Sequence, residues 1–165
     1  MEPPTDDIDR LVAAWRESRP DLDPSPLELV GRAIVLARHL EKSVNDALAE
    51  HGLALGQFDI LATLRRNGPK GGLTPGALLE SVMLSSGGMT ARLQRLEEDG
   101  LVRRLPDPSD RRGVIVELTA KGKKAIDAAT ATRFREAERS LPKLANGERE
   151  KLVGLLRRWL MQIEH

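Results

Sequence analysis

The segment from Leu84 to Gly122, LSSGGMTARLQRLEEDGLVRRLPDPSDRRGVIVELTAKG, decides the fold of this chain. Near its start, three apolar residues recur at helical spacing, Met89, Leu93 and Leu96, and predict an amphipathic helix. Gly100 follows and can adopt the left-handed conformation with which many helices end. The segment is therefore expected to begin with a helix that buries one face.

Two short strands are expected after this helix. One begins at Leu101, and the other is the β-branched run from Val114 to Leu118. Residues 106–110, PDPSD, contain two prolines and cannot extend a ladder, so they predict the connecting loop. Hydroxyl side chains are placed to cap the flanking helices: Ser85 or Ser86 for the first helix and Thr119 for the next.

Further helices are expected upstream of this segment. Residues 57–67 carry apolar side chains on one helical face. Thr74 followed by Pro75 predicts the start of another helix. Proline is tolerated at the first helical position, because the backbone N–H that it lacks would have no partner within the helix there. A helix, a turn, a helix and a hairpin make a winged helix-turn-helix. The predicted fold class is therefore mainly α with a small β-hairpin.

The two ends of the chain predict more helix than a winged helix-turn-helix needs. A short helix is expected over residues 6–17, a long one over residues 27–51, another over residues 120–141, and a last one after Pro142. The long helix and the last helix have wide apolar stripes, and a second copy of the chain is the simplest partner for them. The alternative is that these helices only cover their own core.

Composition excludes several classes of protein. The 165 residues carry a formal net charge of +1, so binding of nucleic acid must depend on local charge. Cysteine is absent, which removes disulfides, thiolate metal sites and cysteine redox sensing. The three histidines are scattered and no glycine-rich phosphate loop follows a strand, so neither an enzyme nor a cofactor or metal site is expected. No apolar run has the length of a membrane span and the acidic N-terminus lacks a signal-peptide core, so we expect a cytoplasmic protein without membrane contact.

Three motifs of the chain resemble those of the MarR family of transcription regulators. They are LEEDGL at residues 96–101, Asp-Arg-Arg at residues 110–112 and VIVELTAKG at residues 114–122. The resemblance implies a homodimer, held by the terminal helices, that binds double-stranded DNA. It divides the chain into an extension helix and linker (1–26), a long dimerisation helix (27–56), a DNA-binding winged helix-turn-helix (57–119) and C-terminal dimerisation helices (120–165).

The predicted recognition helix and wing contain the candidate DNA contacts. Opposite its apolar face, the helix has small residues near its N-terminus, where free N–H groups attract phosphate, and then Gln94 and Arg95, which can bind base edges. An arginine at a hairpin tip can enter a narrow minor groove, and the resemblance implies that Asp110 holds one guanidinium in place. The alternative is a plain surface helix beside a solvated charge cluster. The full set of candidates is Ser85, Ser86, Gly87, Thr90, Gln94, Arg95, Asp110, Arg111 and Arg112.

Three residues indicate a ligand site. Arg92 falls about 70° from the centre of the apolar face, so its guanidinium should be partly buried and needs a partner. Asp59, an acid among apolar neighbours on the preceding helix, is the expected partner. Trp15 is an unusual residue on an otherwise polar extension. The alternative is that Arg92 and Asp59 form a structural ion pair and that Trp15 only packs.

A narrower resemblance covers the same positions. Residues 15–23, 57–66 and 90–93 are similar to the PecS/HucR branch of the family, whose members respond to urate. Urate is a flat anion to which guanidinium groups can donate charge-assisted hydrogen bonds and on which an indole ring can stack. Citrate, aconitate or a phenolic anion are alternative ligands. The effector residues that this resemblance implies are Trp15, Asp59, Arg92 and Arg104.

The sequence thus predicts a sequence-specific DNA-binding transcriptional regulator. We expect a repressor that a small organic anion such as urate releases from a pseudo-palindromic operator. A protein-interaction module without ligand control is the alternative, because winged helices also mediate protein contacts. Arg111 and Arg112 on a short loop favour DNA, since an interaction module has no need for them.

Overall fold

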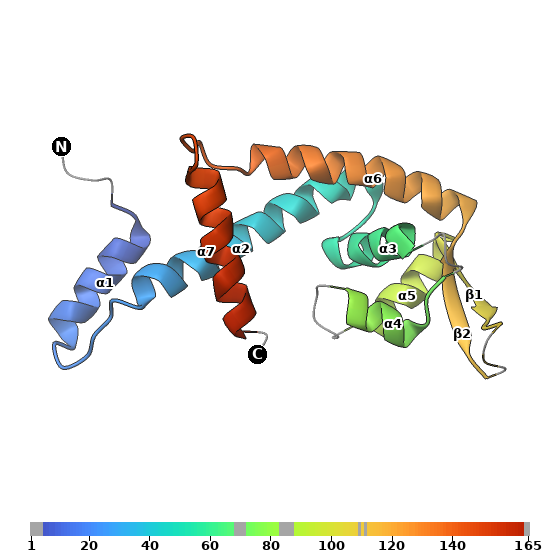
Figure 1. The fold of residues 1–165 in the computed structure, drawn as a ribbon, viewed down its shortest axis with the longest axis horizontal. Coiled ribbons are helices and arrows are strands. Elements are labelled where there is room, and N and C mark those ends of the chain that lie inside the picture. The colour runs from blue at the N-terminus through green and yellow to red at the C-terminus, as the bar shows by residue number, and fades with distance from the viewer. Residues whose placement is uncertain (1–4, 68–71, 83–87, 109, 111, 164–165) are drawn as a thin grey trace.

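The computed structural model describes residues 5–67, 72–82, 88–108, 110 and 112–163 (Figure 1). Its elements are α1 (Asp7–Ser18), α2 (Leu27–Leu48), the 3-10 turn η1 (Ala49–His51), α3 (Leu55–Asn67), α4 (Pro75–Ser81), α5 (Met89–Glu98), β1 (Val102–Pro106), β2 (Val114–Leu118), α6 (Ala120–Arg139) and α7 (Glu148–Ile163). A mainly helical chain with one two-stranded antiparallel sheet confirms the predicted fold class. No helix among these residues is both long enough and apolar enough to span a membrane.

The winged helix-turn-helix forms a lobe at one end of the molecule, where α3, α4 and α5 lie beside the hairpin (Figure 1). The strands are antiparallel, with Val102 opposite Leu118. Leu73, just before α4, exchanges two backbone hydrogen bonds with Val116 at N···O distances of 3.1 and 2.8 Å. The base of the wing is therefore tied to the helix-turn-helix.

The hydrophobic core lies inside this lobe. It joins the last turns of α2, the helices α3, α4 and α5, both strands and the first half of α6 in one buried cluster. Burying one large aliphatic or aromatic side chain of this cluster stabilises the fold by about 1.5–3 kcal/mol. The largest side chains with almost no exposed surface in this cluster are Leu48, Ile60, Leu61, Leu64, Leu78, Leu96, Val116 and Ile126.

The caps of the helices follow local chemistry. Thr74 accepts the backbone N–H of Ala77 at 3.2 Å, and Thr119 caps α6 by accepting the N–H of Gly122, as predicted. The predicted serine cap of α5 is wrong, because the chain turns into that helix only at Gly88, which has a φ of +84° and offers no side-chain acceptor. Ser85 and Ser86, named for that cap, lie outside the described residues.

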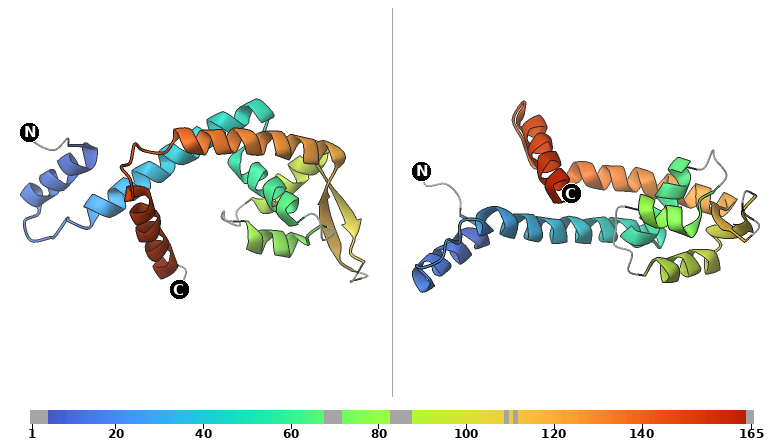
Figure 2. Two further views of the ribbon diagram at one scale, coloured as in Figure 1. Left: turned by 45° about the horizontal axis from the view of Figure 1, so that its top comes forward. Right: turned by 60° about the horizontal axis from the view of Figure 1, so that its bottom comes forward.

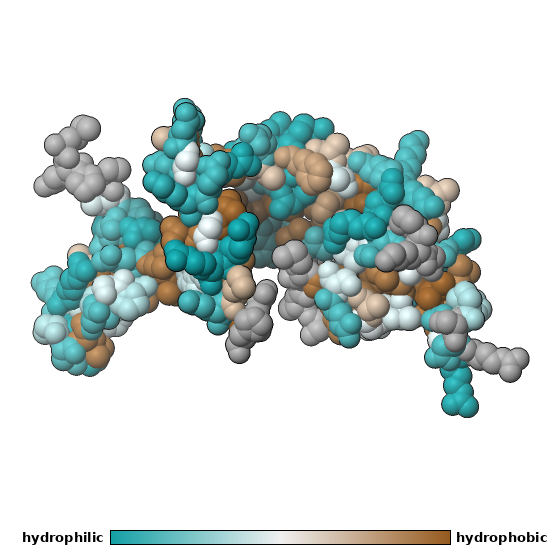
Figure 3. Space-filling view, viewed as in Figure 1, coloured by the Kyte–Doolittle hydropathy of each residue, from teal (hydrophilic) through white to brown (hydrophobic). Residues whose placement is uncertain are grey.

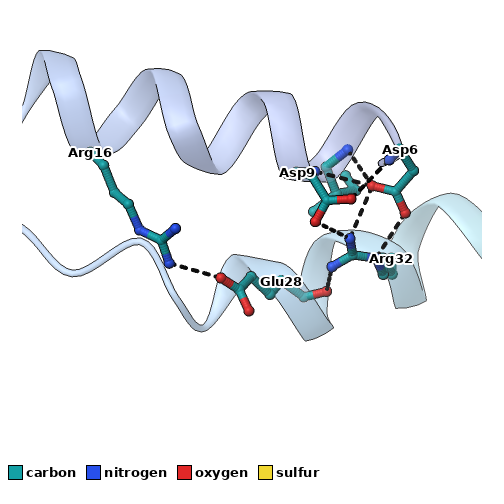
Figure 4. Close-up of polar contacts among 6 residues, drawn as sticks. Asp6, Asp9, Arg16, Glu28 and Arg32 are labelled. Atoms are coloured by element: carbon teal, nitrogen blue, oxygen red, sulfur yellow. Dashed lines mark hydrogen bonds and ion pairs between the residues drawn. The ribbon is translucent and has the colours of Figure 1, made fainter. Parts of the chain in front are cut away.

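Two long helices extend from the lobe. Figure 2 shows α2 and α6 running side by side, with α1 beyond the start of α2 and α7 standing apart beyond the end of α6. Helix α1 packs on α2 through its buried residues Ile8 and Val12, and Ile8 lies against Gly31. Figure 4 shows the polar contacts beside this seam. Arg32 binds Asp6 at 2.8 Å and Asp9 at 2.6 Å, and Arg16 binds Glu28 at 2.9 Å.

Large apolar side chains stay exposed on the long helices. Helix α7 buries none of its residues within this chain. In Figure 3, apolar surface lies between α1 and α7, over α2. Contiguous apolar surface of this kind is rare on a stable monomer and marks an interaction surface. The side chains concerned are Leu29, Val30, Ile34, Leu36 and Leu40 of α2, and Leu152, Val153, Leu155, Leu156, Leu160, Met161 and Ile163 of α7.

Candidate nucleic-acid interface and ligand cavity

Helix α5 has one buried and one exposed face. Met89, Leu93 and Leu96 are buried in the core, which confirms the predicted apolar face. The candidate DNA contacts Thr90, Gln94 and Arg95 are exposed. Because the core fixes the apolar face, the polar face is held in one orientation toward solvent.

The long polar side chains of α5 contact acids at the end of the same helix. The amide nitrogen Nε2 of Gln94 donates to Oε1 of Glu98 at 3.1 Å. Arg95 forms ion pairs with Glu98 at 3.9 Å and with Asp99 at 3.5 Å. These contacts are solvent-exposed and weak, so a stronger acceptor such as a base edge or a phosphate can replace them.

The wing tip is shaped by Asp110. Its Oδ1 accepts the backbone N–H of Arg112 at 2.9 Å and so holds the turn, while the Arg112 side chain stays exposed. Four predicted DNA contacts, Ser85, Ser86, Gly87 and Arg111, lie outside the described residues.

Two further arginines of the wing are paired with acids. Arg103 contacts Glu117, its partner across the ladder, at 3.2 Å. Arg104, a predicted effector residue, binds Glu97 at the end of α5 at 3.1 Å. Arg104 therefore links the wing to the predicted recognition helix.

Arg92 is half-buried under α5, as its position on the helical wheel predicts. Its side chain lies against the backbone of α3, where a Cβ at Gly56 would come within 2.7 Å of Nε. A side chain at position 56 would therefore require the Arg92 side chain to shift.

The expected direct pair between Arg92 and Asp59 is absent, because the structure has neither a hydrogen bond nor an ion pair within 4 Å between these two described residues. Burial raises the pKa of Asp59 above its ordinary value of 3.8. Three guanidinium groups partly oppose this shift, with Arg133 and Arg66 ahead of Arg92. The carboxyl is therefore held in the field of several cations rather than in one ion pair.

A cavity of about 450 Å³ opens beside Asp59, between α3 and α6. Its walls combine aromatic and cationic side chains, and Phe134 is 70% exposed there. Arg66 donates to Thr63 at 2.9 Å, and Arg133 binds the buried Glu136 at 2.9 Å. No group of three His, Asp or Glu side chains that could hold a metal occurs in the described parts of the chain. The lining includes Phe58, Asp59, Arg65, Arg66, Arg133 and Phe134.

The four predicted effector residues do not form one site within a single chain. Only Asp59 lines the cavity, and Arg92 acts on it through space. Trp15 is 45% exposed on α1, at the opposite end of the molecule from α3 and α5 (Figure 1). The physical reason is the length of α2, which separates α1 from the winged lobe.

Sequence reasoning missed that α3 and α6 bring three arginines and two phenylalanines to one cavity. Arg66 is two helical turns from Asp59, and Arg133 and Phe134 follow it by more than 70 residues. An exposed phenylalanine on an otherwise alanine-rich, charged helix was the available signal, since this chain contains only two phenylalanines.

Comparison with known proteins identifies the family. The family model for the MarR family matches residues 51–113. PecS from Dickeya dadantii, an HTH-type transcriptional regulator, is 31% identical over 152 residues, which are 92% of this chain and 92% of PecS. The chain belongs to the MarR family. This membership makes it a DNA-binding transcriptional regulator and not an enzyme.

Two solved MarR family structures show the same arrangement with different ligands. One is a mutant of MarR from Escherichia coli in complex with operator DNA, which is 27% identical with a TM-score of 0.69. The match covers 88% of this chain and 97% of the MarR chain. The other is a MarR family protein from Mycobacterium tuberculosis in complex with p-aminosalicylic acid, which is 25% identical with a TM-score of 0.61. This match covers 79% of this chain and 97% of the Mycobacterium tuberculosis chain. The MarR fold assigned here thus spans nearly the full length of both proteins.

The raised pKa of Asp59 predicts an unusual dependence of stability on pH. The folded chain holds this proton to higher pH than the unfolded chain, so the carboxyl lowers stability as pH rises from 3.8 through its folded pKa. Asp59→Asn cannot ionise and should raise the free energy of unfolding at pH 7, with a smaller gain near pH 4. Urea titrations at both pH values measure this difference.

Asp127→Asn is the matched control with the opposite sign. Its hydrogen bond to Arg65 lowers the pKa of Asp127, so that carboxylate adds stability above pH 3.8 and loses it as pH falls through its folded pKa. Asp127→Asn should therefore lower stability slightly at pH 7. A loss of stability in both variants would contradict the assignment for Asp59.

Proposed function

We propose that this MarR family regulator is a homodimeric repressor that binds a pseudo-palindromic operator and is released by a small planar organic anion. DNA binding is supported above all by the polar face of α5. The core holds this face toward solvent, beside a wing that has the exposed Arg112 at its tip. Residues 57–119 would contact DNA, and the long helices on either side would form the dimer. A protein whose target is chromosomal DNA is expected in the cytoplasm.

The proposed dimer covers the apolar surface of α2 and α7. Helix α7 buries nothing in its own chain, and its side chains Leu155, Leu160 and Ile163 are 54%, 58% and 69% exposed. A second copy is the simplest partner, because a two-fold axis lets one patch cover itself. Two lobes on one dimer would then place two recognition helices about one helical turn of DNA apart, which is the basis for a pseudo-palindromic site.

The proposed effector site is the cavity beside Asp59. Arg66 and Arg133 can donate charge-assisted hydrogen bonds to an anion, and the Phe134 ring offers a flat apolar face. Asp59, when protonated, can donate to a ring nitrogen or carbonyl. These features suit urate, and they also suit a phenolic acid of the kind bound by the Mycobacterium tuberculosis protein.

The remaining predicted effector residues take indirect parts in this proposal. Arg92 connects the cavity to the recognition helix, because its guanidinium acts on the Asp59 carboxyl from α5. Trp15 of one chain lies far from its own cavity, so in this proposal the Trp15 of the second copy would approach it. Arg104 would have to break its ion pair with Glu97 to contact the ligand. A ligand changes DNA affinity only if its own affinity differs between the conformation in which α5 can bind DNA and the one in which it cannot.

The dimer is tested by Leu155→Glu. A charge in the middle of the apolar face of α7 should convert a dimer to a monomer, as measured by sedimentation velocity at micromolar concentration. Arg157→Glu, an exposed change on the other side of the same helix, should leave the dimer intact. A Leu155→Glu protein that still sediments as a dimer would place the interface elsewhere.

The wing is tested by Arg112→Ala on the DNA upstream of the gene. Loss of a minor-groove or phosphate contact should weaken binding to every duplex and reduce the slope of log affinity against log salt by about one. Gln94→Ala should instead cost about 1–3 kcal/mol at one base position, because it would remove a base-edge contact. Fluorescence anisotropy at several salt concentrations separates the two. An unchanged slope for Arg112→Ala argues against the wing contact.

The cavity is tested by Arg66→Gln, with urate, salicylate and citrate titrated into the protein by calorimetry. Removing one cation should weaken binding of the preferred anion by about tenfold or more. It should equally raise the concentration of anion that releases DNA. Arg139→Gln, in the last turn of α6 but outside this cavity, should bind as the wild type does. Equal affinity in the two variants would exclude the cavity.

A further inference from the structure

The end of the recognition helix leaves backbone carbonyls that need donors. Helix α5 ends at Glu98, and Gly100 takes a φ of +68°, so that the N–H of Leu101 returns to the carbonyl of Leu96 at 2.9 Å. The carbonyl of Glu97 accepts the N–H of Gly100 at 2.9 Å. The carbonyls of residues 99–101, which directly follow the last residue of α5, have donors outside the helix. They are bonded by groups from another helix.

Those groups all belong to the first turn of α6. The Lys121 ammonium donates to the carbonyl of Asp99 at 2.6 Å. The Thr119 hydroxyl donates to the carbonyl of Gly100 at 2.7 Å, and the Thr119 backbone N–H donates to that of Leu101 at 3.1 Å. Three successive carbonyls are therefore bound by two residues that lie close together in sequence.

The same turn also fits sterically against the end of α5. Gly122 is buried, and a Cβ at this position would lie 1.9 Å from the carbonyl oxygen of Leu101. Its N–H donates to the Thr119 hydroxyl at 2.9 Å, which fixes the rotamer of that side chain. Residues 119–122, TAKG, thus form a rigid contact, which we call the α5–α6 joint.

The α5–α6 joint connects the recognition helix to the helix that carries the cavity and leads to α7. Helix α6 packs along α2, contributes Arg133 and Phe134 to the cavity wall, and continues toward the exposed apolar surface (Figures 1 and 2). A displacement of α6 is therefore transmitted to α5 through three hydrogen bonds and a close backbone contact.

We propose that Thr119, Lys121 and Gly122 are positioning residues that set the angle of α5 relative to α6. In a dimer this angle determines the spacing at which two recognition helices meet two half-sites. The inference rests on the proposed use of α5 as the recognition helix. Rigid elements that share such a contact move together, which couples the cavity to DNA spacing.

The experiment compares Thr119→Val, which keeps the shape but removes the hydroxyl, with Thr119→Ser, which keeps the hydroxyl. Lys121→Met is the third variant, at an exposed position where folding is not at risk. Each full-length protein is titrated onto an operator selected by the wild type, onto duplexes whose half-site separation changes by one or two base pairs, and onto a duplex with one half-site. Thermal unfolding is measured in parallel.

Thr119→Val and Lys121→Met should bind the native spacing about tenfold more weakly and should lose the preference for that spacing. Binding to the single half-site should match the wild type, and Thr119→Ser should behave as the wild type throughout. A purely structural role would lower the unfolding temperature without changing the spacing profile.

An unchanged spacing profile in Lys121→Met, or a uniform loss with a shallower salt slope, would overturn the inference, because the second result identifies Lys121 as a phosphate contact. Failure of the proposed function gives a different result. In that case the wild type itself prefers no spacing, and Gln94→Ala leaves the single half-site unaffected.

Discussion

The distribution of apolar surface constrains this molecule more than any single contact. Among the described residues, the main buried cluster of one chain lies where α3, α4, α5 and the hairpin meet the end of α2 and the first half of α6. The rest of α2 and all of α7 carry large aliphatic side chains that this core cannot reach. Burial is worth about 25 cal/mol per Å² of apolar surface, so covering these helices provides a large driving force for association. The lobe contains the main buried cluster, whereas the long helices expose apolar side chains that this chain does not cover.

Separation of the core from the apolar helices also separates two functions. The core of the lobe fixes the orientation of α5 and the wing, and in the proposed dimer the helices outside it would determine how two lobes are placed. The cavity beside Asp59 lies on the boundary, since α3 belongs to the lobe and α6 to both parts. The proposed ligand would act at this boundary on the relation between the two parts without unfolding either. Electrostatics favours an anion there, because a half-buried carboxyl shares the site with several guanidinium groups.

Sequence patterns were sufficient for features that depend on neighbouring residues. The apolar spacing of Met89, Leu93 and Leu96 and the cap at Thr119 depend on one helix or one turn, and both are present in the structure. The serine cap failed because the conformation of Gly88 decides where α5 begins. The cavity could not be derived, since Arg133 reaches Asp59 only through the packing of α6 on α3. The partner expected for Arg92 was reasonable by charge, but several cations share that acid.

The acids that close α5 have a consequence for the direction in which the helix can insert into a groove. Glu97, Glu98 and Asp99, which pair with Arg104 and Arg95, lie where the helix dipole is negative, while the opposite end has no acid in its first turn. The helix is therefore electrically polar along its axis. As the proposed recognition helix, α5 would therefore enter a groove with its Met89 end leading, because phosphates favour that end of the dipole. The direction of docking would then follow from the dipole of one short helix, before any base is read.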